Sequence, residues 1–253
     1  MSSLFDLSGQ VALVTGASRG FGQSIAGALA EAGADLVLTS RTLRDVEAVA
    51  AHLAPTGRIV LPLQADVTRA EDVEESVRRA LATLGKIDIL INNAGINIRK
   101  PALELTESDW EQTLDTNVKG CFRFAKAVGR HMVARQTGRI VNIASMLASV
   151  TIPERAAYAS SKGALVQMTR TLAVEWAPFN VRVNAICPGP FLTDLNKVVL
   201  SDPEKVKFFM DRMPMQRFGR PEELHGAVIF LASEASSFIT GTTIYIDGGW
   251  TAL

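Results

Sequence analysis

The sequence predicts an α/β fold in which seven parallel strands form a doubly wound sheet with helices on both faces. Three observations lead to this prediction. Short apolar runs alternate with longer amphipathic segments along the chain, which is the pattern of strand–helix–strand units. The short runs contain few polar residues, as strands covered on both faces require. A glycine-rich turn joins the first run to the first helical segment.

The seven strands are expected where β-branched and apolar residues cluster, at residues 11–15, 36–39, 59–64, 87–92, 139–145, 181–186 and 243–247. Helices are expected between them. The first covers about residues 21–32, and two long helices cover about 109–136 and 156–177. Right-handed crossovers between parallel strands then place the helices on both sides of the sheet.

A hydroxyl followed by an acid three residues later predicts capped helix starts at Thr42, Thr68 and Thr106. No linker or repeat interrupts the pattern, so residues 1–253 are expected to form a single domain. Residues 191–217 break the alternation and predict an inserted lid over the substrate, with one or two short helices. Apolar residues that are candidates to line this lid are Phe191, Met210, Met213 and Met215.

Composition excludes several classes of function. Lysine and arginine number 26, as do aspartate and glutamate, so no nucleic-acid or membrane partner is expected. The two cysteines and three histidines lack the spacing of a zinc site or a disulfide framework, and no metal is expected. The sequence contains no signal peptide and no apolar stretch of membrane-spanning length, which favours a cytoplasmic protein.

The turn after the first strand, residues 15–22, has the glycine spacing Gly-x3-Gly-x-Gly. Glycine permits a tight turn and lets a phosphate approach the backbone amides at the start of the following helix. A dinucleotide cofactor is therefore expected at this turn. The residues assigned to its binding are Gly16, Ser18, Arg19, Gly20, Phe21 and Gly22.

The end of the second strand indicates which dinucleotide is bound. An NAD site usually places a carboxylate there to bind the ribose 2′-hydroxyl, but this strand ends in Ser40 and Arg41, and Asp35 lies at its other end. Arg41, flanked by Arg19, is suited to pair with a 2′-phosphate. The sequence therefore predicts NADP(H) rather than NAD, with Ser40 and Arg41 in the site.

Together with later motifs, this turn resembles the short-chain dehydrogenases/reductases in their compact single-domain form, which have a Rossmann-type sheet. The later motifs are Asn-Asn-Ala-Gly at 92–95, Asn-x-x-Gly at 117–120, Ser145 with Tyr-x-x-x-Lys at 158–162, and Pro-Gly at 188–189. The resemblance implies a homotetramer that packs through the two long helices. It also implies cofactor contacts from Asp66, Val67, Asn93, Ala94, Gly95, Tyr158, Lys162, Pro188, Gly189, Phe191 and Thr193.

The resemblance further implies a catalytic tetrad of Asn117, Ser145, Tyr158 and Lys162. Positions four apart share a helix face, so Lys162 lies beside Tyr158, where its ammonium stabilises the phenolate. Tyr158 can then exchange a proton with an alcohol or carbonyl while a nicotinamide exchanges hydride. Ser145 is placed to hold the substrate oxygen. By resemblance, Asn117 relays protons through water to Lys162.

The substrate is indicated less directly. Residues 93–100, 142–146 and 247–250 resemble sugar-acid members of the family such as gluconate 5-dehydrogenase and ketodeoxygluconate dehydrogenase. Arg99, Lys100 and Arg155 are candidates to bind a substrate carboxylate, and Met146 is a candidate substrate contact. The expected reaction interconverts a secondary alcohol and a ketone on a sugar acid such as gluconate.

Two alternatives remain open at this stage. A 3-oxoacyl-[acyl-carrier-protein] reductase shares the cofactor turn and the tetrad, but it needs an apolar channel and a basic docking face, which the neutral charge disfavours. A non-catalytic NADP-binding regulatory protein would usually have a broken tetrad, and this sequence retains all four residues.

Overall fold

The computed structural model describes residues 3–193 and 201–253. Within these residues the strands are β1 (Val11–Thr15), β2 (Asp35–Ser40), β3 (Val60–Gln64), β4 (Ile89–Asn92), β5 (Gly138–Ile143), β6 (Val181–Pro188) and β7 (Thr243–Ile246). The α-helices are α1 (Gly20–Glu31), α2 (Leu43–Leu53), α3 (Ala70–Leu84), α4 (Glu107–Leu114), α5 (Gly120–Arg135), α6 (Ala156–Trp176), α8 (Pro203–Met210) and α9 (His225–Ala232).

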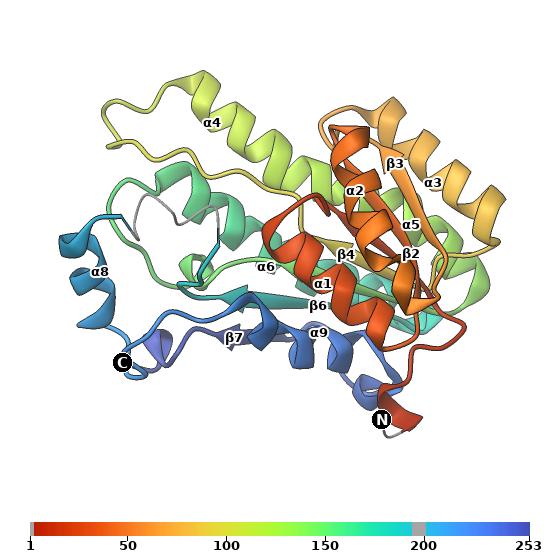
Figure 1. Ribbon diagram of the computed structural model, residues 1–253. Helices are drawn as coiled ribbons and strands as arrows, with labels where there is room; N and C mark the ends of the chain where they lie inside the picture. The colour runs from red at the N-terminus through yellow and green to blue at the C-terminus, as the bar shows by residue number, and fades with distance from the viewer. Residues whose placement is uncertain (1–2, 194–200) are drawn as a thin grey trace.

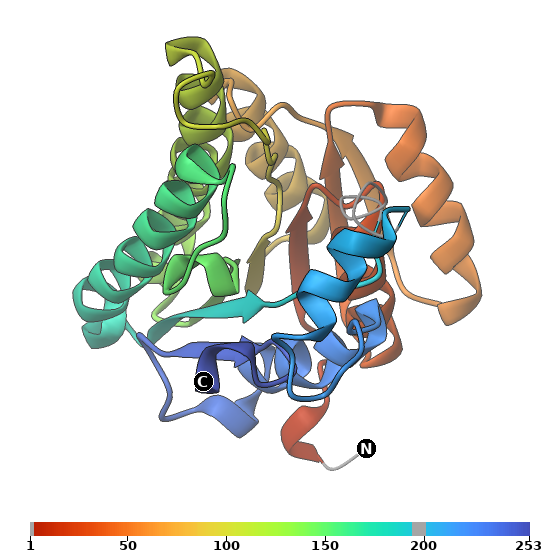
Figure 2. The ribbon, with the colours of Figure 1, turned by 90° about the vertical axis from the view of Figure 1, so that its left-hand side faces the viewer.

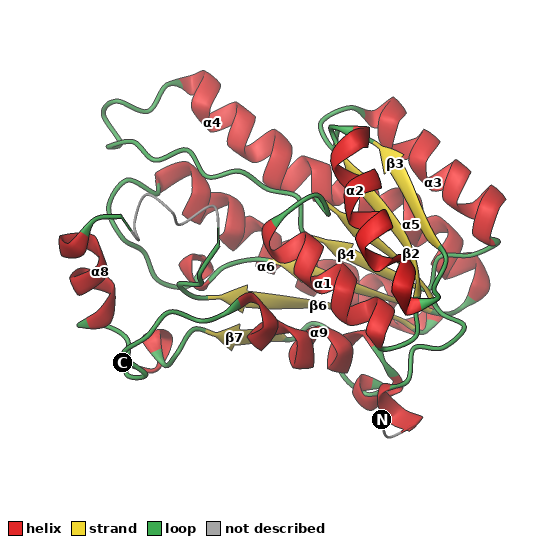
Figure 3. Cartoon of the chain, viewed as in Figure 1, coloured by secondary structure: helices red, strands yellow, loops and turns green. Residues whose placement is uncertain are grey.

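The strands form one sheet in the order β3-β2-β1-β4-β5-β6-β7, and every neighbouring pair is parallel. The predicted doubly wound seven-stranded sheet is confirmed (Figures 1 and 3). The strand order reverses between β1 and β4, which is the position where open α/β sheets form a crevice at their carboxyl edge. The view in Figure 2 shows α6 and α9 on opposite sides of the strands.

Each strand divides its side chains between two apolar layers. In β1, Ala12 and Val14 pack with α1 and α9 on one face, whereas Val11 and Leu13 pack with α3 and α5 on the other. This division follows from the two-residue period of a strand. All five residues of β1 are buried, so the sheet centre is a rigid base for the loops at its carboxyl edge.

The three predicted helix caps have different outcomes. Thr106 caps α4 as predicted: its hydroxyl accepts from the Asp109 backbone, and the Asp109 carboxylate accepts from the Thr106 backbone. Thr42 is the residue before α2, but its side chain makes no capping hydrogen bond. The cap at Thr68 is wrong, because α3 begins later and the Thr68 hydroxyl donates to Asp66 in the preceding turn.

The long helix predicted over 109–136 is interrupted. After α4 ends at Leu114, the chain makes a π-helical turn, Asp115–Lys119, before α5 begins at Gly120. Such turns are rare and occur frequently at functional sites. Asn117 lies within this turn and is fully buried.

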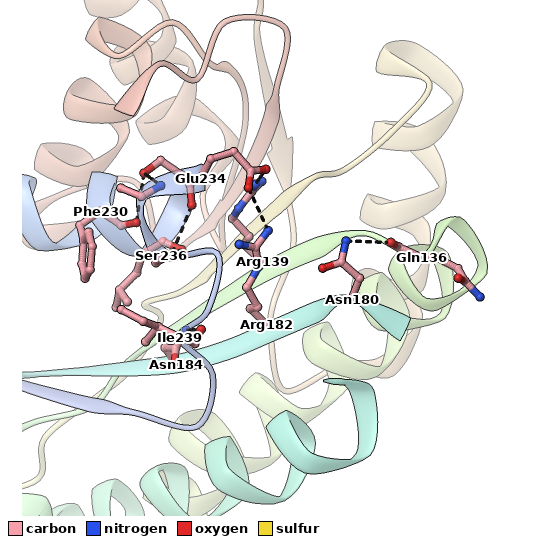
Figure 4. A network of polar contacts seen from close by, with 12 residues as sticks. Gln136, Arg139, Asn180, Arg182, Asn184, Phe230, Glu234, Ser236 and Ile239 are labelled. Carbon is pink, nitrogen blue, oxygen red and sulfur yellow. Dashed lines mark hydrogen bonds and ion pairs between the residues drawn. The ribbon is translucent and has the colours of Figure 1, made fainter. Parts of the chain in front are cut away.

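A pair of buried arginines holds the amino ends of β5 and β6. Arg139 and Arg182 are neighbours in the strand register, and both side chains are buried and ion-paired with the more exposed Glu234, after α9. Figure 4 shows this network. Burial, followed by the charge of Arg139, lowers the pKa of Arg182. Glu234 thus joins two neighbouring strands, β5 and β6, to a turn distant in sequence.

The predicted lid, residues 191–217, lies partly outside the described residues, at 194–200. Its described part contains one α-helix, α8. In Figure 1, β6 and β7 point toward the side of the molecule where α8 lies. Helix α8 therefore belongs to the carboxyl edge of the sheet.

Candidate active site

A cavity of about 1120 Å³ lies along the carboxyl edge of the sheet. Three of the predicted catalytic and cofactor-binding residues, Gly22, Asn117 and Phe191, are not in its wall. The predicted site residues that line it are Gly16, Ser18, Arg19, Gly20, Phe21, Ser40, Arg41, Asp66, Val67, Asn93, Ala94, Gly95, Arg99, Ser145, Met146, Arg155, Tyr158, Lys162, Pro188, Gly189 and Thr193.

The three residues outside the wall lie directly behind it. A Cβ at Gly22 would be 2.2 Å from the Gly16 carbonyl oxygen, so this glycine permits close packing of the turn. Phe191 is buried and meets Phe21 edge to face, with ring centroids 5.2 Å apart. Gly22 and Phe191 therefore support residues that line the cavity.

The glycine turn fits a dinucleotide phosphate. Gly16 has φ of +63°, and a Cβ there would be 2.9 Å from the Cα of Ala94. Gly20 has φ of +56° and open space where a Cβ would project. The Asn93 amide fixes the turn by donating to the carbonyls of Thr15 and Gly16 at 3.0 and 3.1 Å. The start of α1 is thus open to an anion in the cavity.

The end of β2 forms the part of the cavity expected to hold the ribose. The Ser40 hydroxyl donates to the Thr42 carbonyl at 2.7 Å and accepts from its amide at 3.2 Å. The Arg41 side chain is exposed at the cavity wall. Asp45, in the first turn of α2, also lines the cavity. This carboxylate was not predicted, because the residues that distinguish NAD from NADP were expected at the strand end and Asp45 stands in the following helical turn.

Two segments form the wall beyond β3. In one, the Asp66 carboxylate accepts from the backbone and hydroxyl of Thr68 at 2.9 and 2.8 Å, which closes a tight turn. In the other, Asp115 and Thr116 of the π-helical turn line the same cavity. Asp115 and Thr116 were not predicted as wall residues, because a regular helix was expected there.

Tyr158 and Lys162 lie on α6 and face the cavity together. The Lys162 Nζ is 5.6 Å from the centroid of the Tyr158 ring, and it donates to the Ile143 carbonyl at 2.8 Å. Lys162 is only 4% exposed. The ammonium is therefore held at a fixed position beside the phenol, where its charge acts through a poorly solvated environment.

Ser145 follows β5 and lines the cavity with Tyr158 and Lys162. Its hydroxyl accepts from the Leu147 amide at 3.2 Å, which begins a short 3₁₀ turn, Met146–Ala148. Because one lone pair of the oxygen is used by this amide, its hydrogen remains available to donate to a substrate oxygen.

Asn117 is hydrogen-bonded both to the segment after β4 and to α6. Its Oδ1 accepts from the Ile96 amide at 2.8 Å, and its Nδ2 donates to the Ile96 carbonyl and the Ser161 hydroxyl. A Cβ at Gly95 would lie 3.2 Å from Asn117 Oδ1 and 3.7 Å from Lys162 Nζ. Asn117 and Lys162 thus both lie against Gly95, with Asn117 behind the wall.

Two of the three basic candidates for the substrate lie in the wall near Tyr158. Burial is the main cause that lowers the pKa of both Arg99 and Arg155, and Arg99 contributes to the shift at Arg155. The Arg155 guanidinium donates to the Glu154 carbonyl at 2.9 Å. Lys100 is not in the cavity wall. Its ammonium is instead ion-paired, at 2.6 Å, with the carboxylate of Asp109 in the first turn of α4.

An apolar wall accompanies these arginines. It contains Met146, which was expected to contact the substrate, and Phe209 and Phe218, which were not predicted. Phe209 is on α8 and stacks against Phe218 and Trp250, with centroids 5.9 and 5.5 Å away. Apolar residues in an insertion carry no spacing signal, so only the folded chain identifies which of them reach the cavity. Met213 packs beneath this wall, and Met215 is exposed.

Within residues 3–193 and 201–253, no three histidine, cysteine, aspartate or glutamate side chains come together as a metal site would require. None of the helices in this part of the chain has the length and apolar character needed to cross a membrane.

The chain is similar to known proteins over nearly its whole length. Residues 16–251 match the family model described as "Enoyl-(Acyl carrier protein) reductase". An NAD-dependent glycerol dehydrogenase from Listeria innocua is 42% identical over 98% of this chain and 96% of its own length. A 2-dehydro-3-deoxy-D-gluconate 5-dehydrogenase from Escherichia coli K12 is 40% identical over 99% of this chain and 98% of its own length.

A solved structure has nearly the same backbone. It is a gluconate 5-dehydrogenase from Burkholderia cenocepacia in complex with NADP and tartrate, with a TM-score of 0.97 and 38% identity. The match covers 99% of this chain and 98% of that one. The similarity therefore extends over the sheet, the helices and the carboxyl-edge cavity.

Proposed function

This chain belongs to the short-chain dehydrogenase/reductase family and acts on CH–OH groups, and from that premise we propose that it interconverts a secondary alcohol and a ketone on a sugar acid with NADP(H). The observation that carries the proposal is the shared cavity of Ser145, Tyr158 and Lys162 with two arginines, the half-buried Arg99 and the buried Arg155. The first three residues supply alcohol–ketone chemistry, and the arginines favour an anionic substrate.

In this proposal Tyr158 is the group that transfers the proton. During oxidation its phenolate takes the hydroxyl proton of the substrate, and during reduction the phenol returns a proton to the carbonyl oxygen. A bound nicotinamide supplies the hydride acceptor or donor. The Lys162 ammonium, held by the Ile143 carbonyl, stabilises the phenolate form.

Ser145 and Asn117 have supporting roles. The Ser145 hydroxyl donates to the substrate oxygen and stabilises its developing negative charge. Asn117 fixes the Ile96 segment and Ser161 by hydrogen bonds at 2.8–3.0 Å. Its position next to Gly95 and Lys162 suits a water-mediated path for the proton.

The cofactor is held by the glycine turn and by Arg41. We propose NADP(H), because Arg41 and Arg19 are exposed cations at the ribose end of the cavity, although Asp45 adds one negative charge there. An Arg41→Gln variant is expected to lose about 10- to 100-fold in kcat/KM for NADPH, as the loss of a charge-assisted hydrogen bond implies. Arg44→Gln, on the same helix start, is the control. Preference of the parent protein for NAD would overturn this assignment.

The sugar-acid assignment depends on the two arginines near Tyr158. Gluconate and the neutral polyol glucitol provide a direct comparison of substrates that differ in the carboxylate. The parent is expected to prefer gluconate, and Arg155→Met is expected to raise KM for gluconate about tenfold, with little change for glucitol. Equal kinetics of parent and variant with gluconate would exclude Arg155 from the substrate site.

A reductase acting on 3-oxoacyl thioesters is the second candidate. The observation that favours it is the apolar wall of Met146, Phe209 and Phe218. Measuring NADPH consumption with acetoacetyl thioesters and with 5-ketogluconate distinguishes the two candidates. Faster turnover of the thioester would replace the sugar-acid proposal.

We also propose a cytoplasmic homotetramer. Helices α5 and α6 carry the exposed apolar residues Phe122 and Val174, which are 45% and 77% accessible. Burial of such surfaces between subunits is favourable. Sedimentation equilibrium is expected to give four times the chain mass, and a monomer at micromolar concentration would contradict the assembly.

A further inference from the structure

Arg123 connects two parts of the cavity wall that are far apart in sequence. Its Nη1 donates to the Val67 carbonyl at 3.2 Å and to the Asp115 carboxylate at 3.3 Å. Val67 belongs to the turn after β3, and Asp115 begins the π-helical turn. The Arg123 side chain is only 17% exposed, so these contacts are partly shielded from water and from salt.

The same two segments are also in close van der Waals contact. A Cβ at Gly120, the residue that begins α5, would be 2.6 Å from the Val67 Cγ2 and 3.3 Å from its carbonyl oxygen. No free space therefore separates Val67 from the end of the π-helical turn. Because packed interiors are not continuously deformable, displacement of one segment requires displacement of the other.

The π-helical turn has a second face toward the proton-transfer residues. Asn117, two residues after Asp115, binds the backbone of Ile96 through both its amide oxygen and its amide nitrogen. It also donates to Ser161, whose hydroxyl donates to the Tyr158 carbonyl at 2.6 Å. One short turn thus contacts both the wall beyond β3 and the helix that carries Tyr158.

We infer that Arg123 is a positioning residue that couples occupancy of the cavity beside Asp66–Thr68 to the placement of Asn117. This inference rests on the proposed dinucleotide site, whose predicted cofactor contacts include Asp66 and Val67, and it takes the purine end of the cofactor to lie beside them. A ligand that orders the loop also orders the π-helical turn, because Arg123 and the Val67–Gly120 contact join them. Such coupling is reciprocal: the factor by which a ligand at the loop shifts the placement of Asn117 equals the factor by which fixing Asn117 in that placement raises the affinity of the loop for the ligand.

The first test needs no turnover. Adenosine 2′,5′-bisphosphate contains the purine end of NADP without the nicotinamide, and amide hydrogen exchange reports where it orders the chain. In the parent it is expected to slow exchange about tenfold at residues 66–68 and also at Ile96, whose amide binds Asn117. In Arg123→Gln the protection at residues 66–68 remains, while protection at Ile96 falls below twofold.

Arg130→Gln is the matched control, because Arg130 is also on α5 and forms an exposed ion pair with Glu74 at 3.0 Å. It is expected to behave as the parent. Protection at Ile96 in Arg123→Gln equal to that in the parent would overturn the inference, as would a parent in which the probe protects only residues 66–68 or nothing. If Arg123→Gln does not fold, Arg123→Lys, which keeps the charge but not the forked geometry, replaces it.

The second test is a double-mutant cycle on turnover. Arg123→Gln is expected to lower kcat about fivefold at saturating cofactor and substrate, without further effect in an Asn117→Ala background. This non-additivity is the signature of a residue that acts through Asn117. Independent effects that multiply would overturn it. A parent with normal coupling in hydrogen exchange but no activity toward any acid would refute the proposed function and leave the coupling intact.

Discussion

At the scale of single residues, the proton-transfer role of Tyr158 is the most direct prediction. Tyr158→Phe retains the ring but removes the hydroxyl, and it is expected to lower kcat about 1000-fold, within the range of general acid–base catalysis. Binding of NADPH, measured by fluorescence, is expected to change less than threefold.

The chain offers a matched control in Tyr245, its other tyrosine. The Tyr245 hydroxyl contacts the Ser149 hydroxyl outside the cavity wall. Tyr245→Phe is expected to retain most activity. Comparable losses in the two variants would show that the phenol at position 158 has no special role.

A second prediction at this scale concerns the reactivity of the two cysteines. Burial raises the pKa of the Cys121 and Cys187 thiols to about 11. At pH 8 only about one thiol in 1000 is then a thiolate, the reactive form, and both side chains are shielded. Ellman's reagent is expected to modify neither in the native protein and both in guanidinium. Rapid native labelling would show that the thiols are accessible.

Sequence reasoning at this scale succeeded where spacing within one element sets the geometry. Tyr158 and Lys162 lie one helical turn apart, and the structure places them together at the cavity. Asp45, Phe209 and Phe218 were missed. Their approach to the cavity depends on how α2 and the insertion turn back over the sheet, and no local pattern encodes that.

At the scale of elements, the capping box of α4 makes the free energy of unfolding depend on pH in the acid range. Lys100 and the Thr106 backbone lower the pKa of the Asp109 carboxyl to about 2 from an ordinary 3.8. Because the folded value is below the unfolded value, the stabilisation is present above pH 3.8 and is lost as the pH falls toward 2.

The variant Asp109→Asn tests this dependence. Its stability, from urea unfolding, is expected to be lower than that of the parent at pH 6, with the difference disappearing toward pH 2. Glu107→Gln, in the same helical turn but outside the capping box, is the control. A difference that stays constant from pH 6 to pH 2 would show that the Asp109 charge does not contribute.

Secondary-structure propensity and hydrophobic periodicity were sufficient to predict some elements but not others. The sheet and its seven strands were predicted, because near-continuous apolar runs admit few alternatives. The π-helical turn at 115–119 was not predicted. Its extra residue in the helix is held by Asn117 bonding to Ile96 and Ser161, contacts that exist only after β4 and α6 have packed.

At the scale of the whole molecule, Glu234 is expected to contribute to stability through the two arginines at the amino edge of the sheet. Glu234→Gln leaves Arg139 and Arg182 buried without a carboxylate partner. The expected loss is about 2 kcal/mol in the free energy of unfolding, the range for hydrogen bonds to charged groups.

Thermal or urea unfolding measures this loss, and Glu47→Gln, at an exposed position on α2, is the control. Activity per folded molecule is expected to remain unchanged, since the network is at the opposite edge of the sheet from the cavity. Unchanged stability of Glu234→Gln would show that water replaces the carboxylate at no cost.

The order of the strands in the sheet also has a consequence for synthesis of the chain. Residues 11–64 supply β1, β2 and β3, which form one half of the sheet. The inner edge of β1 remains unpaired until residues 89–92 emerge as β4. A nascent chain that pauses before this point displays a strand that is apolar except for Thr15, the kind of edge that recruits other chains. Ribosome speed between β3 and β4 is therefore expected to influence how much of the protein reaches its native state.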